Sequence, residues 1–220
     1  RELMPLESLA CYFDDSFSDD LQVNVVAGYL APVEIWDRVF TPAWNRVLRD
    51  EAPSKVSEFK ASDCASGRGE FDGWSKEDRR SLVVELVSVI RSTPIYAGVS
   101  AAFFWPGRAD PSGTREEVRG WRRKMETRGY GTCVGLCLGD AIGLGLHLAE
   151  TDSVQPVLDE KQTFSRIVAS NFDAVRKQVP ELEHKLRFPV EGNSKELAPL
   201  QAADLLAYET LKEVINRCEP

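Results

Sequence analysis

The sequence predicts an α/β fold built on one central mixed sheet of about five strands flanked by helices. Short apolar runs typical of buried strands alternate along the chain with longer segments whose apolar residues recur at helical spacing. The length predicts a single domain over residues 1–220, because no internal repeat or long linker divides them. Hydrophobic residues make up 43% of the chain and charged residues 28%, which excludes a disordered or low-complexity protein.

The first half of the chain predicts a strand hairpin followed by two helices. Residues 9–13 are an apolar run, typical of a central strand, and residues 23–30 form a second run after a polar hinge. Pro32 then opens a helix whose large apolar residues recur at helical spacing. Residues 51–74 are irregular, and Ser75 is the expected N-cap of the next helix.

The second half predicts three further strands, with helices between them. The expected strands are 95–105, 154–158 and 186–190. Helices are expected at 114–128, 164–179 and 200–216, and a glycine-rich apolar segment follows the first of them. We expect residues 108–150 to form a helical insertion within the domain.

Charge and cysteine content limit the classes of function. A net charge of -8 argues against a protein that coats nucleic acid through overall positive charge, but a metal-dependent nucleic-acid enzyme stays open. No apolar run reaches the roughly 20 residues of a membrane helix, so no membrane association is expected. The five cysteines are odd in number and lack paired CxxC spacing, which favours reduced thiols in a cytoplasmic protein.

Carboxylates follow two of the predicted strands. Asp14 comes directly after the first strand and Asp159 directly after the fourth. Ligands of open α/β sheets gather beyond the strand ends, so these two side chains meet there if the strands are neighbours. Each of these aspartates, taken singly, is also an ordinary turn residue.

Asp204 lies within the apolar stripe of the last predicted helix. An ionised carboxylate cannot stay alone in such a place. The carboxyl group must be protonated, paired with Arg or Lys, hydrogen-bonded in helix packing, or bound to a cation. The cation site gains support from Asp14 and Asp159, which Asp204 can face from the helix. Oxygen ligands without converging Cys or His suit Mg²⁺ or Mn²⁺ rather than Zn²⁺.

Four motifs resemble a known family, in order over most of the chain. They are Tyr12-Phe-Asp-Asp-Ser16, Glu58-Phe-Lys60, Val157-Leu-Asp-Glu160 and Leu200-Gln-Ala-Ala-Asp-Leu-Leu-Ala-Tyr-Glu209. Together they resemble the bacterial and archaeal family known as domain of unknown function 3800. The resemblance implies a ribonuclease H-like fold and the metal-dependent nuclease activity suspected for that family.

The resemblance also assigns roles to residues. It implies that Asp14, Asp159 and Asp204 are catalytic carboxylates that bind the metal, with Glu58 as a candidate fourth catalytic residue and Gln201 as a neighbour that shapes the site. The family's first motif is usually Asp-Glu-Ser-Gly, whereas this chain has Asp15 at the second position and Phe17 at the fourth. We therefore count Asp15 and Ser16 as accessory residues.

A carboxylate site of this kind predicts phosphodiester chemistry. Two divalent ions about 4 Å apart can activate water and stabilise the leaving oxygen. Lys60, two residues after Glu58, is either a contact for the phosphate or a solvated lysine.

A basic segment is the candidate surface for binding nucleic acid. Arg115, Arg119, Arg122 and Arg123 belong to a predicted helix, where the first two share a face with one of the others. The same helix carries several glutamates, so a solvated helix laced with ion pairs is the competing interpretation.

Three functions follow as expectations. The first is Mg²⁺- or Mn²⁺-dependent cleavage of nucleic acid of unspecified type. The second is hydrolysis of a small nucleotide at the same metals, which needs no extended basic strip. The third is a non-catalytic domain of the same fold that binds a partner protein or forms a homo-oligomer, and binding of divalent ions separates it from the other two.

Overall fold

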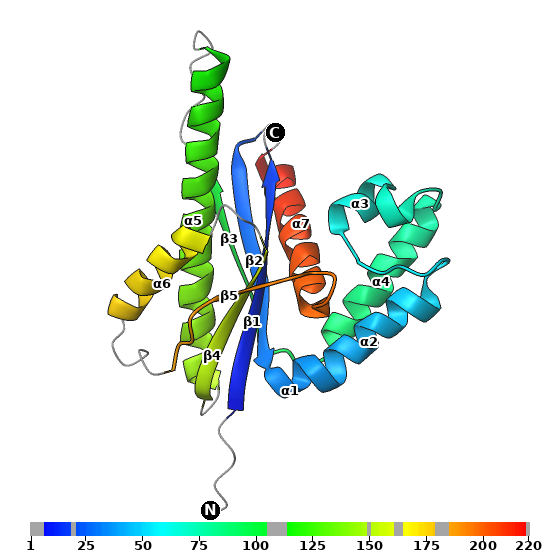
Figure 1. Cartoon of the computed structure of the whole chain (residues 1–220). Helices are drawn as coiled ribbons and strands as arrows, with labels where there is room; N and C mark the ends of the chain where they lie inside the picture. The colour runs from blue at the N-terminus through cyan, green and yellow to red at the C-terminus, as the bar shows by residue number, and fades with distance from the viewer. Residues whose placement is uncertain are drawn as a thin grey trace, which may run out of the picture.

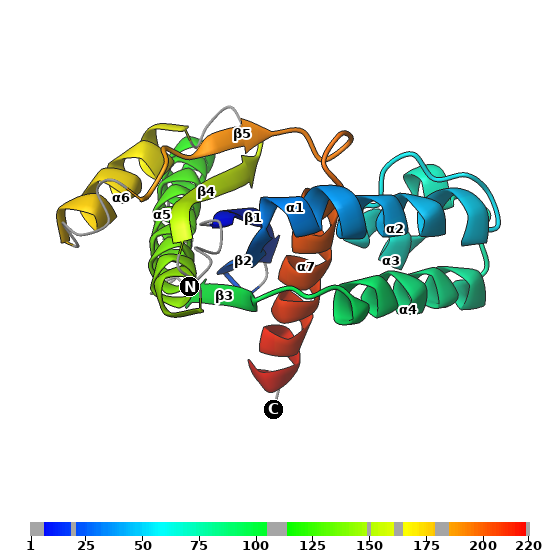
Figure 2. The ribbon, with the colours of Figure 1, turned by 90° about the horizontal axis from the view of Figure 1, so that it is seen from below.

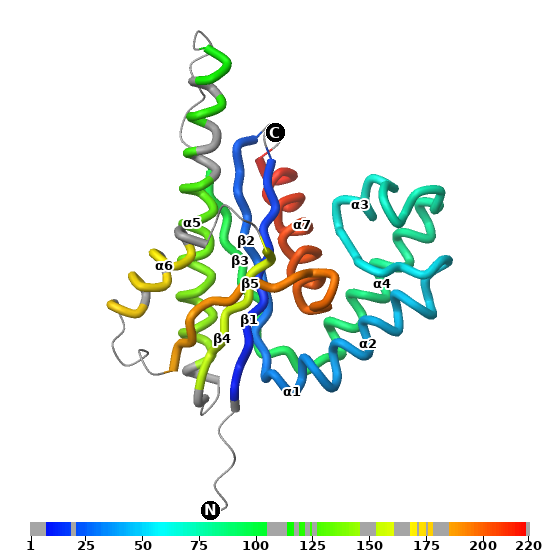
Figure 3. The backbone as a smooth tube through the Cα atoms, in the orientation of Figure 1, coloured from blue at the N-terminus to red at the C-terminus, as the bar shows by residue number. Residues whose placement is uncertain are grey.

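The computed structural model describes residues 7–18, 21–104, 114–148, 151–160, 165–178 and 185–218, which Figure 3 shows in colour. A five-stranded mixed sheet runs through the centre of the molecule in the order β3-β2-β1-β4-β5. The strands are β1 (Glu7–Ser18), β2 (Val23–Pro32), β3 (Ala97–Phe104), β4 (Thr151–Asp159) and β5 (Val190–Gly192). Only β2 runs antiparallel to its neighbours. The predicted α/β class with a mixed sheet of about five strands is confirmed.

Helices cover both faces of the sheet. Helices α5 (Arg115–Leu148) and α6 (Ser165–Gln178) lie on one side, and α7 (Ala198–Cys218) lies on the other (Figures 1 and 2). Because side chains alternate along a strand, β1 contributes to two cores. Leu9, Cys11 and Phe13 pack toward α5, while Ala10 and Tyr12 pack toward α7.

A helical lobe extends beyond α7 (Figure 1). It begins with a continuous helical stretch in which α and π turns alternate. The turns are α1 (Val33–Ile35), η1 (Trp36–Phe40), α2 (Thr41–Arg46) and η2 (Val47–Glu51). The lobe continues with α3 (Ala61–Ser66), the 3-10 turn η3 (Gly69–Phe71) and α4 (Lys76–Ser92). Ser75 caps α4 as predicted, because its Oγ accepts a hydrogen bond from Asp78 N at 3.0 Å.

Aromatic side chains join the lobe to the sheet. The ring of Trp36 lies 5.3 Å from that of Tyr12 on β1 and 5.0 Å from that of Phe40. Trp44 follows at 5.3 Å from Phe40, and its ring lies 6.0 Å from that of Phe59. Edge-to-face and stacked pairs at these separations stabilise the packing beyond the area that they bury. The lobe is therefore anchored on the central strand.

One glycine allows the hairpin to close tightly. Gly28 on β2 pairs with Phe13 on β1, and a Cβ atom at this position would overlap the carbonyl oxygen of Tyr12. Any other residue would push the two central strands apart.

Three predicted boundaries are wrong. β1 does not end at Phe13 but continues to Ser18, because β2 offers backbone partners along this whole length. The fifth strand is β5 at Val190–Gly192, and of the predicted residues before Val190 only Leu186 forms a bridge, with Val154. The charged helix does not stop at residue 128, since α5 continues through the glycine-rich segment to Leu148. Packing against the sheet outweighs the low helix propensity of the glycines.

Among the helices of the described residues, none is both long and apolar enough to cross a membrane.

Candidate functional site

The register of two parallel strands places Asp14 beside Asp159. Tyr12 on β1 pairs with Val157 on β4, and Phe13 pairs with Leu158. Asp14 and Asp159 are the next residues of the two strands. Tyr12 and Val157 belong to the core on the α7 side, so the alternation of a strand directs the two aspartates to the same side.

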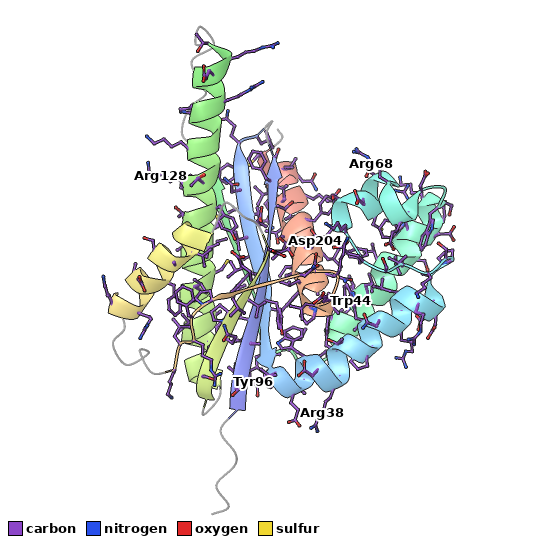
Figure 4. The ribbon with its side chains drawn as sticks, in the orientation of Figure 1. Arg38, Trp44, Arg68, Tyr96, Arg128 and Asp204 are labelled. Carbon is purple, nitrogen blue, oxygen red and sulfur yellow. The ribbon has the colours of Figure 1, made fainter. Side chains whose placement is uncertain are left out.

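Helix α7 contributes the third aspartate. It packs against β1 and β2, and Asp204 is half-buried on it. Figure 4 shows Asp204 between the sheet and the helical lobe. Its Oδ2 accepts a hydrogen bond from the backbone N of Ala61, the first residue of α3, at 2.7 Å. Of the roles left open for Asp204, a hydrogen bond in helix packing is therefore present.

The three aspartates line one cavity of about 270 Å³, which we call the aspartate cavity. Asp15, Ser16 and Lys60 line it as well. The remaining lining residues are Phe17, Phe59, Ser62, Ser194 and Tyr208. The structure thus brings together side chains that are up to 194 positions apart in the sequence (208 − 14).

The negative charge of this region acts on the opposite side of the sheet. Burial raises the pKa of Tyr130 on α5, and the nearby carboxylates Asp15, Asp14 and Asp159 raise it further. Burial also raises the pKa of Cys133 to about 11, with a smaller contribution from Asp15. A phenol or thiol resists ionisation where anions surround it. The potential at the strand ends therefore favours a cation.

Glu58 lies at the edge of the aspartate cavity and does not line it. Its Oε1 accepts a hydrogen bond from Ser194 Oγ at 2.7 Å and lies 3.6 Å from Lys60 Nζ. The Glu58 side chain is only 11% exposed, whereas that of Lys60 is 50% exposed. Glu58 thus contacts both Ser194 and Lys60, and Lys60 lines the cavity while half of its side chain stays exposed.

Gln201 joins three segments around the site. Its side chain is buried, and Oε1 accepts hydrogen bonds from Trp44 Nε1 at 2.9 Å and from Phe59 N at 3.1 Å. Its Nε2 donates to the carbonyl oxygen of Ser194 at 2.7 Å. Gln201 therefore holds the backbone of Phe59, next to Glu58 in the chain, and the backbone of Ser194, whose hydroxyl donates a hydrogen bond to Glu58.

The basic segment lies apart from the aspartate cavity. Arg115 and Arg119 are exposed on α5, which packs on the opposite face of the sheet from α7, and neither lines the cavity. Figure 4 shows this separation for Arg128 of the same helix and Asp204. The side chains of Arg122 and Arg123 lie outside the described part of the structure.

Sequence reasoning missed several lining residues of the site, among them Ser194 and Tyr208. Ser194 stands in a turn after β5, where nothing in the sequence distinguishes it from other loop serines. Tyr208 follows Asp204 by four positions, so helical spacing alone places both on one face. That spacing was the available signal, but it also suits an ordinary core tyrosine.

The aspartate cavity has the oxygen ligands of a magnesium or manganese site, but these ligands are not grouped around one point. Carboxylate and hydroxyl oxygens from Asp14, Asp159, Asp204 and Ser16 are ligands that these ions prefer. Among the described residues, no three His, Cys, Asp or Glu side chains are grouped tightly enough to hold a metal ion as they stand. The aspartates would have to move closer together around an ion.

No protein-family model matches this chain, and no curated protein matches it at a significant level.

Proposed function

We propose that this protein is a ribonuclease H-like enzyme that uses Mg²⁺ or Mn²⁺ to hydrolyse phosphodiester bonds in nucleic acid. One observation carries the proposal: aspartates from β1, β4 and α7 line a single cavity beside a lysine. The sheet order supports the fold assignment. The second strand is antiparallel to the rest and the first strand lies between the second and the fourth, as we expect of a ribonuclease H-like sheet.

The charge of the aspartate cavity supports a role for divalent cations. Asp14, Asp15, Asp159 and Asp204 carry four negative charges when ionised and Lys60 one positive charge, which leaves an excess of three (4 − 1). A phosphodiester is itself an anion and is repelled by such a cavity. Bound divalent ions remove this repulsion, since they are the largest local charges of such a site.

The residues have distinct roles in this proposal. Asp14, Asp159 and Asp204 would hold the metal, which supplies an activated water and stabilises the charge of the leaving oxygen. Lys60 orients the phosphate from the cavity wall, and Glu58 positions Lys60. Gln201 keeps the segment around Phe59 in place from α7, so that the lobe and the sheet form one site.

Cleavage of labelled single- and double-stranded DNA and RNA oligonucleotides tests the proposal. The wild-type protein should cleave at least one of them in Mn²⁺ or Mg²⁺ and none in EDTA. Asp159→Asn should reduce the rate by about 100-fold or more, because it removes a metal ligand. Asp140→Asn is the matched control, since Asp140 is exposed on α5 and does not line the cavity.

Binding of Mn²⁺, followed by electron paramagnetic resonance, separates the competing functions. Metal binding with cleavage of mononucleotides alone would favour the hydrolase of small nucleotides. A wild-type protein that binds no Mn²⁺ at millimolar concentration and cleaves nothing would overturn the proposal and favour a domain that binds a protein partner.

A further inference from the structure

A second cavity of about 260 Å³ opens between α3, α4 and α7, and we call it the α3–α4–α7 pocket. It shares two lining residues, Phe59 and Tyr208, with the aspartate cavity. Ala61 lines the pocket and Asp204 lines the aspartate cavity, so the hydrogen bond between them lies at the boundary. The two cavities are therefore neighbours on one surface.

Helix α7 connects the two cavities through one row of side chains. Asp204, Tyr208 and Lys212 follow each other at intervals of four residues, which places them on the same face of the helix. At 1.5 Å per residue, Tyr208 lies about 6 Å and Lys212 about 12 Å from Asp204 along the helix axis. The aspartate cavity and the pocket therefore lie along the same face of α7.

The pocket carries an excess of positive charge. Lys76, Arg79, Arg80 and Lys212 line it, against the single acid Glu209, which leaves three positive charges (4 − 1). This sign is opposite to that of the aspartate cavity. A protein with a net charge of -8 thus concentrates cations beside its carboxylates.

Some of these cations are fixed by the fold, and others face the solvent. Arg79 Nη1 donates to the carbonyl oxygens of Cys64 and Ala65 at 2.7 Å each, so Arg79 holds the end of α3. Lys76 and Arg80 are exposed and form no ion pair within the described part of the chain. These two are available for an anionic ligand.

The rest of the pocket is apolar. Its walls include the side chains of Ala61, Val83 and Leu205 together with the rings of Phe59 and Tyr208. Lys212 Nζ lies 5.5 Å from the centre of the Tyr208 ring and is hydrogen-bonded to Glu209. An apolar and aromatic wall beside exposed cations suits a planar base that carries a phosphate.

We infer that the α3–α4–α7 pocket binds the nucleotide that flanks the scissile phosphodiester, with its base against the apolar wall and its phosphate at Lys76 and Arg80. This inference rests on the proposed nuclease function and names the subsite that the substrate uses. In this inference residues of the lobe bind the phosphate, whereas the sequence suggested that Arg115 and Arg119 on α5 do so. The ligand class is a nucleoside monophosphate unit.

Calorimetric titration in EDTA tests the pocket without the metal. The probes are the 5′-monophosphates of the common ribonucleosides and deoxyribonucleosides, with inorganic phosphate and the free nucleosides as separate arms. At least one monophosphate should bind the wild-type protein more tightly than phosphate or its nucleoside does. Equal binding of phosphate and every monophosphate would overturn the inference, because it would show an anion site without a base subsite.

Two variants change the pocket in different ways. Arg80→Gln removes a cation, and Ala65→Phe fills the pocket from the exposed side of α3 without changing charge. Each should weaken monophosphate binding by about tenfold or more, because a charge-assisted contact or the base subsite is lost. Arg91→Gln is the matched control, an exposed arginine about three turns farther along α4, and it should bind like wild type.

The same variants distinguish failure of the pocket from failure of the proposed nuclease. On oligonucleotides, Arg80→Gln and Ala65→Phe should raise KM by about tenfold with a much smaller change in kcat, because they remove binding rather than chemistry. If both variants show metal-dependent cleavage with an unchanged KM, the inference about the pocket is wrong and the proposed nuclease function is still supported. Monophosphate binding that both variants lose, with no cleavage by wild type, supports the pocket and overturns the nuclease.

Discussion

The indole N–H of Trp44 donates a hydrogen bond to Oε1 of Gln201 at 2.9 Å, across 157 positions of the sequence. Both side chains are buried, and the bond ties the helical lobe to the helix that carries Asp204. The arrangement of the site therefore depends on a residue that touches neither metal nor substrate in the proposed chemistry.

Gln201→Leu should destabilise the protein strongly. The change leaves the N–H groups of Trp44 and Phe59 and the carbonyl of Ser194 without their partner in a buried place. The expected loss in the free energy of unfolding is about 2–5 kcal/mol, measured by urea denaturation. Asn216→Leu removes an exposed amide from the same helix and should change stability by less than about 0.5 kcal/mol. Equal effects of the two changes would contradict the role of Gln201.

Divalent ions should raise the melting temperature. Neighbouring ionised carboxylates repel each other, so an ion that binds them stabilises the native state by mass action, by about 2.7 kcal/mol at 100 times its Kd. Thermal melts in EDTA, Mg²⁺ and Mn²⁺ measure the effect. Asp14→Asn should abolish it, whereas the exposed Asp140→Asn should keep it. Identical melting of the wild type in all three conditions would count against an ion in the aspartate cavity.

Two substitutions at Asp204 should separate its structural role from its charge. Asn keeps an oxygen that can accept the hydrogen bond from Ala61 N, while Ala leaves that N–H without it. In EDTA, Asp204→Ala should be less stable than Asp204→Asn by about 0.5–2 kcal/mol, the usual cost of a lost helix cap. Both should lose the response to Mn²⁺. If Asp204→Asn alone costs about 3–5 kcal/mol in EDTA, Asp204 is the acceptor of a buried ion pair instead.

Thiol labelling should detect one cysteine in the native protein. Burial raises the pKa of Cys11, Cys64, Cys133 and Cys137, so these thiols stay protonated as well as inaccessible at pH 8. Cys218 is exposed at the end of α7. A disulfide reagent should therefore label one thiol quickly in buffer and all five in denaturant. Cys218→Ser should remove the fast phase, and fast labelling that persists in this variant would contradict the burial of the other four cysteines.

Stability should fall in alkali. Burial raises the pKa of Tyr12 and of Tyr29 to about 12. A raised pKa means that the folded state keeps a proton that the unfolded state releases near pH 10. Each tyrosine therefore contributes stability below pH 10 that is lost as the pH rises to 12, by about 2 kcal/mol. Urea unfolding of wild type and Tyr29→Phe at pH 9, 10 and 11 measures this. The variant should show the smaller decline, and parallel curves would contradict the assignment.

Local patterns of the sequence predicted most of the elements but not how they meet. The apolar runs of the hairpin, the cap at Ser75 and the stripe of α7 are short-range signals, and the structure contains all three. The extension of β1 through polar residues depends on the partner β2, which no local window includes. For the same reason the sequence did not predict the position of the lobe, in which α and π turns alternate.

The candidate site shows the same division. Asp14, Asp159 and Asp204 were recognisable because carboxylates at strand ends and in an apolar stripe are unusual. The hydrogen bond from Ser194 to Glu58 could not be predicted, because a contact between positions 136 apart depends on the assembled fold. The sequence also indicated a basic surface on α5, whereas the structure places Lys60 in the aspartate cavity itself and further cations of α4 and α7 in the neighbouring pocket. Their spacing along the chain forms no basic run.

The docking of α7 on β1 and β2 has a consequence for the order of assembly. Translation supplies Asp14 and then Asp159, and Asp204 follows 45 residues later (204 − 159). At about 5–20 residues per second, a nascent chain spends about 2–9 s with two of the three aspartates and without Gln201. Closing contacts of such long sequence separation is also slow in folding. A chain still under synthesis therefore carries an incomplete aspartate cavity, which is finished only when α7 has been made and has docked.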